Sequence, residues 1–94
     1  MYIGIGIKHV AYTAKPTIKL EMFPSLRLPY REMIDDMINL AKKSKGIIIP
    51  WGGEDVFPTD MKGRFPISIC CYIEFKSISD EIEFEQIVKD FQFS

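Results

Sequence analysis

The sequence predicts a small α+β domain, a two-layer sandwich in which two helices cover one face of a four-stranded sheet. Three observations predict this class. The 94 residues suffice for one domain, residues 1–94, and 47% of them are hydrophobic. Four segments have strand-type patterning, and two have helical patterning. These segments follow one another in the order β-β-α-β-β-α, which fits one two-layer core.

Two strands and a turn are predicted at the start of the chain. Residues 2–12 alternate, so we expect one inward set, which is Ile3, Ile5, Ile7 and Ala11. Residues 13–16 are typical of a turn. Residues 17–23 alternate again, with Ile18, Leu20 and Met22 on one face. Two alternating segments joined by a short turn predict an antiparallel hairpin.

The first helix is predicted between Pro29 and Gly46. Apolar residues recur at helical spacing, namely Met33, Ile34, Met37, Ile38 and Ala41. Pro29 suits the first turn, where its missing N–H has no partner to lose. Lysines crowd the end of this segment and complement the helix dipole. Gly46 is then expected to be the C′ residue that ends the helix.

The second half of the chain predicts two strands and the second helix. Residues 47–49 are three isoleucines, typical of a buried strand that Pro50 ends. Residues 66–76 alternate, with Ile67, Ile69, Cys71, Ile73 and Phe75 expected to face inward. Asp80 and Glu83 have the spacing of a capping box. The helix that follows carries an apolar stripe of Phe84, Ile87, Val88 and Phe91.

One arrangement satisfies all of these constraints. The β-α-β unit of residues 17–49 should cross over right-handedly and leave its two strands parallel. The result is a ferredoxin-like sheet whose last strand has moved to the front of the chain, a circular permutation. A plain α+β meander with both helices on one side is the alternative. Neither topology specifies a function.

Composition excludes several classes of protein. Twelve Lys and Arg nearly balance thirteen Asp and Glu, giving a net charge of −1, without the basic excess typical of nucleic-acid-binding proteins. No apolar run approaches the roughly 18–20 residues that a membrane span needs. Cys70 and Cys71 are adjacent, so they point to opposite faces of a strand and do not form a disulfide framework. We therefore expect a cytoplasmic protein. A single His without a Cys-x-x-Cys motif predicts neither a metal site nor a cofactor.

The first candidate binding surface is the segment of residues 51–65. It carries the only tryptophan together with aromatic and charged residues, and Trp and Arg are enriched at binding hot spots. The residues that we expect to contact a partner there are Trp51, Glu54, Asp55, Phe57 and Arg64. The alternative is that this segment only covers the core.

The second candidate is the outward face of the sheet. Alternation places Phe23 and Tyr72 there, with Tyr2 and Tyr12, among the lysines 8, 19 and 76. Aromatic residues interleaved with lysines are one way in which proteins stack single-stranded nucleic acid. Glu21 and Glu74 share this face and would repel phosphates, so a protein interface is the favoured interpretation.

Three further residues carry reactive groups. His9 lies on the inward side of its strand and is interpreted as a partly buried structural residue. Cys71 is expected to fill the core, whereas Cys70 faces outward. An enzyme or ligand-binding protein with a pocket under residues 51–65, using His9 or Cys70, is one alternative. The leading hypothesis is a regulatory, inhibitory or accessory module without catalytic residues, which binds another protein or a second copy of itself.

Overall fold

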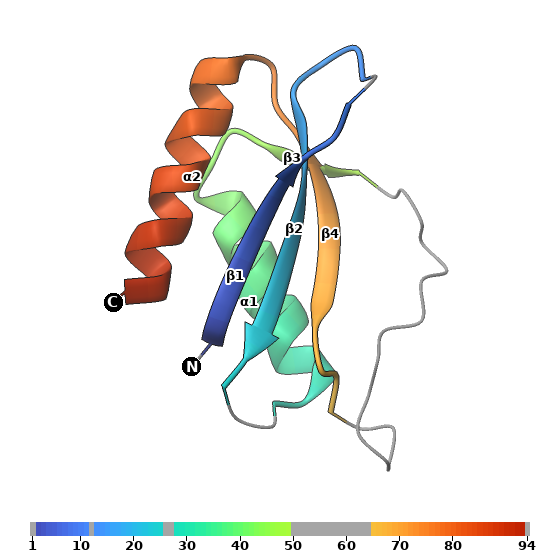
Figure 1. The fold of residues 1–94 in the computed structure, drawn as a ribbon, viewed down its shortest axis with the longest axis vertical. Helices are drawn as coiled ribbons and strands as arrows, with labels where there is room; N and C mark the ends of the chain where they lie inside the picture. Colours follow the sequence, from blue (N-terminus) through green and yellow to red (C-terminus); the bar gives the residue numbers. More distant parts are fainter. Residues whose placement is uncertain (1, 12, 26–27, 50–64, 94) are drawn as a thin grey trace.

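The computed structural model describes residues 2–11, 13–25, 28–49 and 65–93. Within them, the chain forms a four-stranded sheet and two helices, an α+β arrangement compatible with a two-layer sandwich (Figure 1). The strands are β1 (Tyr2–His9), β2 (Thr17–Pro24), β3 (Ile47–Ile49) and β4 (Ile69–Glu74). The helices are α1 (Tyr30–Lys42) and α2 (Ile78–Phe93).

The sheet has the strand order β1-β2-β4-β3, and every neighbouring pair is antiparallel. Because β2 and β3 both run antiparallel to β4, they are parallel to each other and flank it. α1 connects these two strands, and α2 follows β4. Both helices lie on the same side of the sheet (Figure 1). The opposite face is covered by neither helix.

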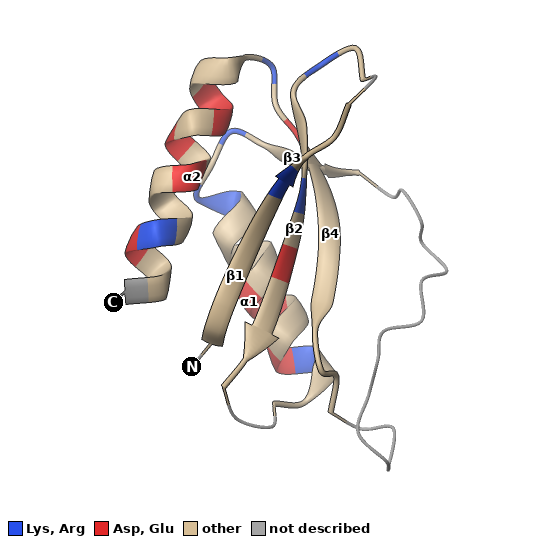
Figure 2. Cartoon of the chain, viewed as in Figure 1, with Lys and Arg blue, Asp and Glu red and all other residues tan. Residues whose placement is uncertain are grey.

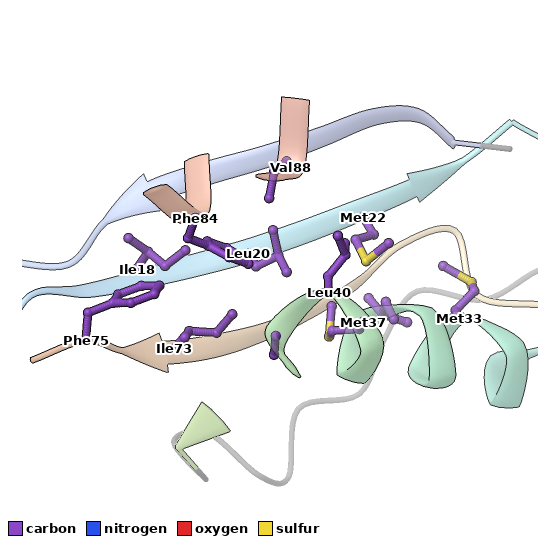
Figure 3. Packing of buried hydrophobic residues seen from close by; sticks show 12 residues of the cluster. Ile18, Leu20, Met22, Met33, Met37, Leu40, Ile73, Phe75, Phe84 and Val88 are labelled. Carbon is purple, nitrogen blue, oxygen red and sulfur yellow. The ribbon is translucent and has the colours of Figure 1, made fainter. Parts of the chain in front are cut away.

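The hydrophobic core lies between the sheet and the two helices. β2 and β4 supply the central residues through the alternation that the sequence predicts, and both helices supply the opposing residues (Figure 3). The rings of Phe75 and Phe84 pack with their centroids 5.5 Å apart. The buried hydrophobic residues are Ile18, Leu20, Met22, Met33, Met37, Leu40, Ala41, Ile69, Ile73, Phe75, Phe84 and Val88.

A bulge at the start of β1 corrects the predicted faces of Tyr2 and Ile3. Tyr2 pairs with Pro24 and Gly4 pairs with Phe23, so the register shifts between Tyr2 and Gly4. A bulge inserts one residue and reverses the side-chain alternation beyond it. Tyr2 therefore packs against the core, while Ile3 is 73% exposed. The prediction that Ile3 faces inward and Tyr2 outward was wrong.

The ends of both helices differ from the prediction. α1 ends at Lys42, and the Ser44 hydroxyl donates to the carbonyl of Ala41 at 2.8 Å, so Gly46 lies beyond the C′ position. At Gly46, an added Cβ would lie 2.7 Å from Cε1 of Phe75, so the close approach of the core explains the glycine. α2 begins earlier than Asp80. The Ser77 hydroxyl accepts the N–H of Asp80 at 3.3 Å and caps this helix.

The short strand β3 is an edge strand of the sheet and is not buried, contrary to the prediction. Ile47 is 60% exposed and Ile48 is 39% exposed. Among the described strands, β3 pairs only with β4. An apolar run is typical of a central strand, but a strand at the end of a sheet has one neighbour and leaves more of its surface open. β4 begins at Ile69, and the preceding Ile67 is 59% exposed instead of facing inward.

Candidate functional site

The predicted partner-binding residues fall into two groups. Trp51, Glu54, Asp55, Phe57 and Arg64 lie outside the described residues. Phe23 and Tyr72 lie on β2 and β4, and the strand register places them, as alternation predicts, on the sheet face that neither helix covers, which is called the uncovered sheet face below (Figure 1). Both side chains are partly buried.

The uncovered sheet face combines apolar and charged side chains. Register places Ile47 and Ile49 of β3 on the same face as Tyr72, and Phe23 lies on β2 opposite Gly4 of β1. The charged residues of this face are Lys8, Lys19, Glu21 and Glu74. These strand residues, two lysines and two glutamates, carry no net charge.

Two ion pairs neutralise part of this face, one between β1 and β2 and one from the turn before β2 to β4. The Nζ atom of Lys8 lies 3.8 Å from Oε1 of Glu21, and that of Lys15 lies 3.9 Å from Oε1 of Glu74. Figure 2 shows no run of basic residues along the strands, whereas acidic residues gather in the first half of α2. Phosphate binding depends on unpaired basic charge. In the described part of this face, two of the nearby lysines, Lys8 and Lys15, are therefore already paired with carboxylates.

A second cluster lies on the other side of the sheet, where the end of β1 meets α2. The imidazole of His9 lies between two carboxylates of α2: Nδ1 contacts Oε1 of Glu81, and Nε2 lies 3.4 Å from Oε1 of Glu85. Glu81 and Glu85 are four residues apart, so the helix places them on one face. The Glu81 side chain is only 8% exposed, and that of His9 is 68% exposed.

Two hollows flank this cluster. One, of about 340 Å³, lies between β1 and α2 and is lined by Ile5, Ile7, Glu85, Val88, Lys89 and Gln92. The other, of about 330 Å³, borders the turn after β1 and includes His9, Lys15, Ile78 and Glu81 in its lining. Solvent and small ions can therefore approach the cluster from both sides.

Sequence reasoning placed His9 correctly on the inward side of β1, but the prediction that it is partly buried was wrong, and its carboxylate partners were missed. The available signal was Glu81. It precedes Phe84 by three residues and Val88 by seven, so it falls on the apolar stripe of α2. A carboxylate at a core position of a helix is rarely buried without a partner. That position therefore indicated a polar contact, although not its identity.

Tyr2 forms a further polar contact on the helix side. Its hydroxyl donates to Oδ2 of Asp36 on α1 at 2.5 Å, and its ring lies 5.9 Å from that of Phe91 on α2. Burial raises the pKa of Tyr2 above its usual range, and the nearby Asp36 carboxylate adds to the rise. Tyr2 thus links β1 to both helices, which is a structural role.

Both cysteines are free thiols, and they differ in their surroundings. Cys71 faces the core opposite Leu20, and Cys70 faces outward opposite Glu21, as predicted. Burial raises the pKa of Cys71 to about 12, with a smaller contribution from Cys70. A thiol held protonated is a poor nucleophile. Cys71 is a partly buried residue that packs against the core.

This raised pKa predicts an alkaline loss of stability. Above about pH 9 the unfolded chain ionises Cys71, whereas the folded protein keeps it protonated up to about pH 12. The stabilising contribution is complete below pH 9 and is lost as pH rises through this window, at about 1.4 kcal/mol per pH unit. We expect Cys71→Ala to remove this part of the slope of unfolding free energy against pH in urea titrations. Cys70→Ala is the control, and an equal slope in wild type and Cys71→Ala would contradict the prediction.

No helix in the described part of the chain is long and apolar enough to cross a membrane. Comparison of the chain with protein-family models, with curated proteins and with solved structures finds no match.

Proposed function

We propose that this protein is a protein-binding module whose contact surface is the uncovered sheet face, and that the partner is a second copy of the chain. The observation that carries the proposal is the composition of this face. Phe23, Tyr72, Ile47 and Ile49 form its apolar part, and the charged residues of its strands are equal in number and opposite in sign.

Charge balance favours self-association over other contacts. In a two-fold symmetric dimer the same surface meets itself, so each charge needs an opposite charge within that surface. A face with two lysines and two glutamates meets this condition. It offers no net attraction for a polyanion. Gly4 and Gly6 add a strip without side chains at which another chain can approach the backbone closely.

The size of the face predicts a weak dimer. Eight-residue strands such as β1 and β2 extend about 26 Å, and four strands span roughly 19 Å. A standard stable interface buries about 800 Å² on each partner. The sheet face alone is smaller than that, so we expect dissociation in the micromolar range or above.

A substitution at Gly6 tests this surface. An added Cβ at Gly6 meets no atom within 4 Å, so the monomer should accommodate Gly6→Arg. In the dimer, the long charged side chain would project into the interface. We expect sedimentation equilibrium to show that Gly6→Arg weakens dimerisation by about tenfold or more, or about 1.4 kcal/mol. The matched control is Ile82→Arg, because Ile82 is 60% exposed on α2 and lies away from this face.

Three outcomes would overturn the proposal. The wild-type chain could remain monomeric up to millimolar concentration. Ile82→Arg could weaken the dimer as much as Gly6→Arg. Wild type could instead bind a labelled single-stranded oligonucleotide with an affinity that falls as salt rises, which would support the nucleic-acid alternative. We also propose Trp51 and Phe57 as anchors of the same contact.

We propose that the topology is a circularly permuted ferredoxin-like fold, since β2 and β3 flank β4 in parallel, α1 connects them, and β1 pairs with the outer side of β2. We also propose a cytoplasmic location. The two free, adjacent thiols on opposite faces of β4 support it, because such thiols persist in reducing compartments.

A further inference from the structure

The cluster of His9, Glu81 and Glu85 brings together three groups that bind metal ions. They come from the end of β1 and from two successive turns of α2. One potential ligand atom from each residue can be chosen so that all three lie within 4.8 Å of one another. Neither the uncovered sheet face nor the core packing accounts for this convergence.

The charge of the cluster is not balanced by basic side chains. Within the described part of the chain, no lysine or arginine pairs with Glu81 or Glu85. Two nearby lysines pair with other residues: Lys45 lies 3.9 Å from Asp80, and Lys15 lies 3.9 Å from Glu74. Lys89 lines the same hollow as Glu85 without an ion pair to it among the described residues. The acidic first half of α2 adds further negative charge (Figure 2). A cation in this position would be held by favourable electrostatics.

The burial of Glu81 is a second reason to expect a cation here. Its Oε1 atom is buried and forms no hydrogen bond within the described residues, and its polar contact is with Nδ1 of His9, a member of the same cluster. Burying a carboxylate oxygen without a hydrogen bond or a metal costs free energy. The Glu81 side chain therefore offers a carboxylate oxygen close to the His9 imidazole and the Glu85 carboxylate.

We propose that His9, Glu81 and Glu85 bind one divalent transition-metal ion of the zinc class. An imidazole nitrogen with two carboxylate oxygens suits zinc better than calcium or magnesium, which favour oxygen ligands alone. Bonds of about 2.0–2.2 Å require ligand atoms roughly 3–3.5 Å apart. His9 is exposed and Glu85 is partly exposed, so rotations of these two side chains can open the contact of His9 with Glu81 and bring the three ligand atoms to this spacing. Water from the flanking hollows would complete the coordination.

A metal-free explanation exists for the same contacts. A doubly protonated imidazole donates from both nitrogens, and His9 has one carboxylate at each nitrogen. That arrangement is an ion-pair bridge between β1 and α2. It predicts no affinity for metal ions near neutral pH, so a binding measurement separates the two explanations.

Isothermal titration of the chelator-treated chain with Zn²⁺ at pH 7.5, under a non-thiol reductant, tests the site. We expect one ion to bind per chain and to raise the melting temperature. His9→Ala and Glu85→Gln should each weaken binding by tenfold or more. These two side chains are the more exposed members of the cluster, so their replacement leaves the core intact. Glu81→Gln is avoided as the principal variant because that side chain is buried.

Two controls exclude other causes. Glu83→Gln removes the same charge from an exposed position of α2, two residues from Glu81 and therefore on the opposite side of the helix. It should leave the affinity unchanged, as should Cys70→Ser, which removes the outward thiol. Co²⁺ should give visible absorption without a thiolate charge-transfer band. Absence of binding, equal affinity in His9→Ala and wild type, or loss of binding in Cys70→Ser would overturn the proposal.

Discussion

Phe84→Ala is expected to lower the free energy of unfolding by about 3–5 kcal/mol, the usual cost of truncating a fully buried aromatic side chain. Phe84 has no exposed surface, and its ring packs against that of Phe75 (Figure 3). It belongs to α2 and contacts the end of the core where β2 and β4 meet the helix. Its loss leaves a cavity that the neighbouring strands can close only in part.

The effect is large because a domain of this size retains only about 5–15 kcal/mol in total. Thermal unfolding followed by circular dichroism should show a melting temperature lower by roughly 15–30 °C. Ile82→Ala, at an exposed position of the same helix, should change stability by less than about 0.5 kcal/mol. Equal losses in the two variants would contradict the placement of Phe84 in the core.

Gly46→Ala is the second large expected effect, at about 1–3 kcal/mol. The added Cβ would lie 2.7 Å from Cε1 and 3.1 Å from Cζ of Phe75, and it would also collide with Cγ2 of Ile73. Both neighbours are fully buried and cannot move aside cheaply. Gly6→Ala is the control, because its Cβ would meet nothing within 4 Å and should be tolerated in urea unfolding.

A further variant separates the two explanations of Gly46. If the residue were a helix C′ position, Asn would be tolerated better than Ala, because Asn adopts the left-handed conformation. If close approach to the core selects glycine, the larger Asn should destabilise the protein more than Ala does. We therefore expect Gly46→Asn to be less stable than Gly46→Ala. The reverse order would restore the interpretation as a helix-ending residue.

Local periodicity predicted the core of this protein well. The inward residues of β2 and β4, such as Leu20 and Ile73, are buried, as are Met33, Met37 and Val88 on the helices. A residue's face follows from its position in a strand or helix once the element is regular, so nearby residues suffice to determine it. The same reasoning failed at Tyr2 and Ile3, where a bulge breaks the regular alternation.

The candidate sites were harder to predict because they depend on contacts between distant segments. Alternation was sufficient to place Phe23 and Tyr72 on the uncovered face. It could not place His9 beside Glu81 and Glu85, because they belong to opposite ends of the chain. Their meeting depends on which strand lies next to α2. That in turn depends on how the whole core packs.

The sequence by itself determined the hairpin strands β1 and β2, both helices and most of the buried residues. Hydrophobic periodicity is a local property, and it carries that information directly. Only the tertiary structure decided the strand order, the exposure of β3 at the sheet edge, the reason for Gly46, and the cluster at His9. Each of these features results from the packing of segments that are far apart in the chain. The arrangement that buries the apolar surface also determines which polar groups come into contact.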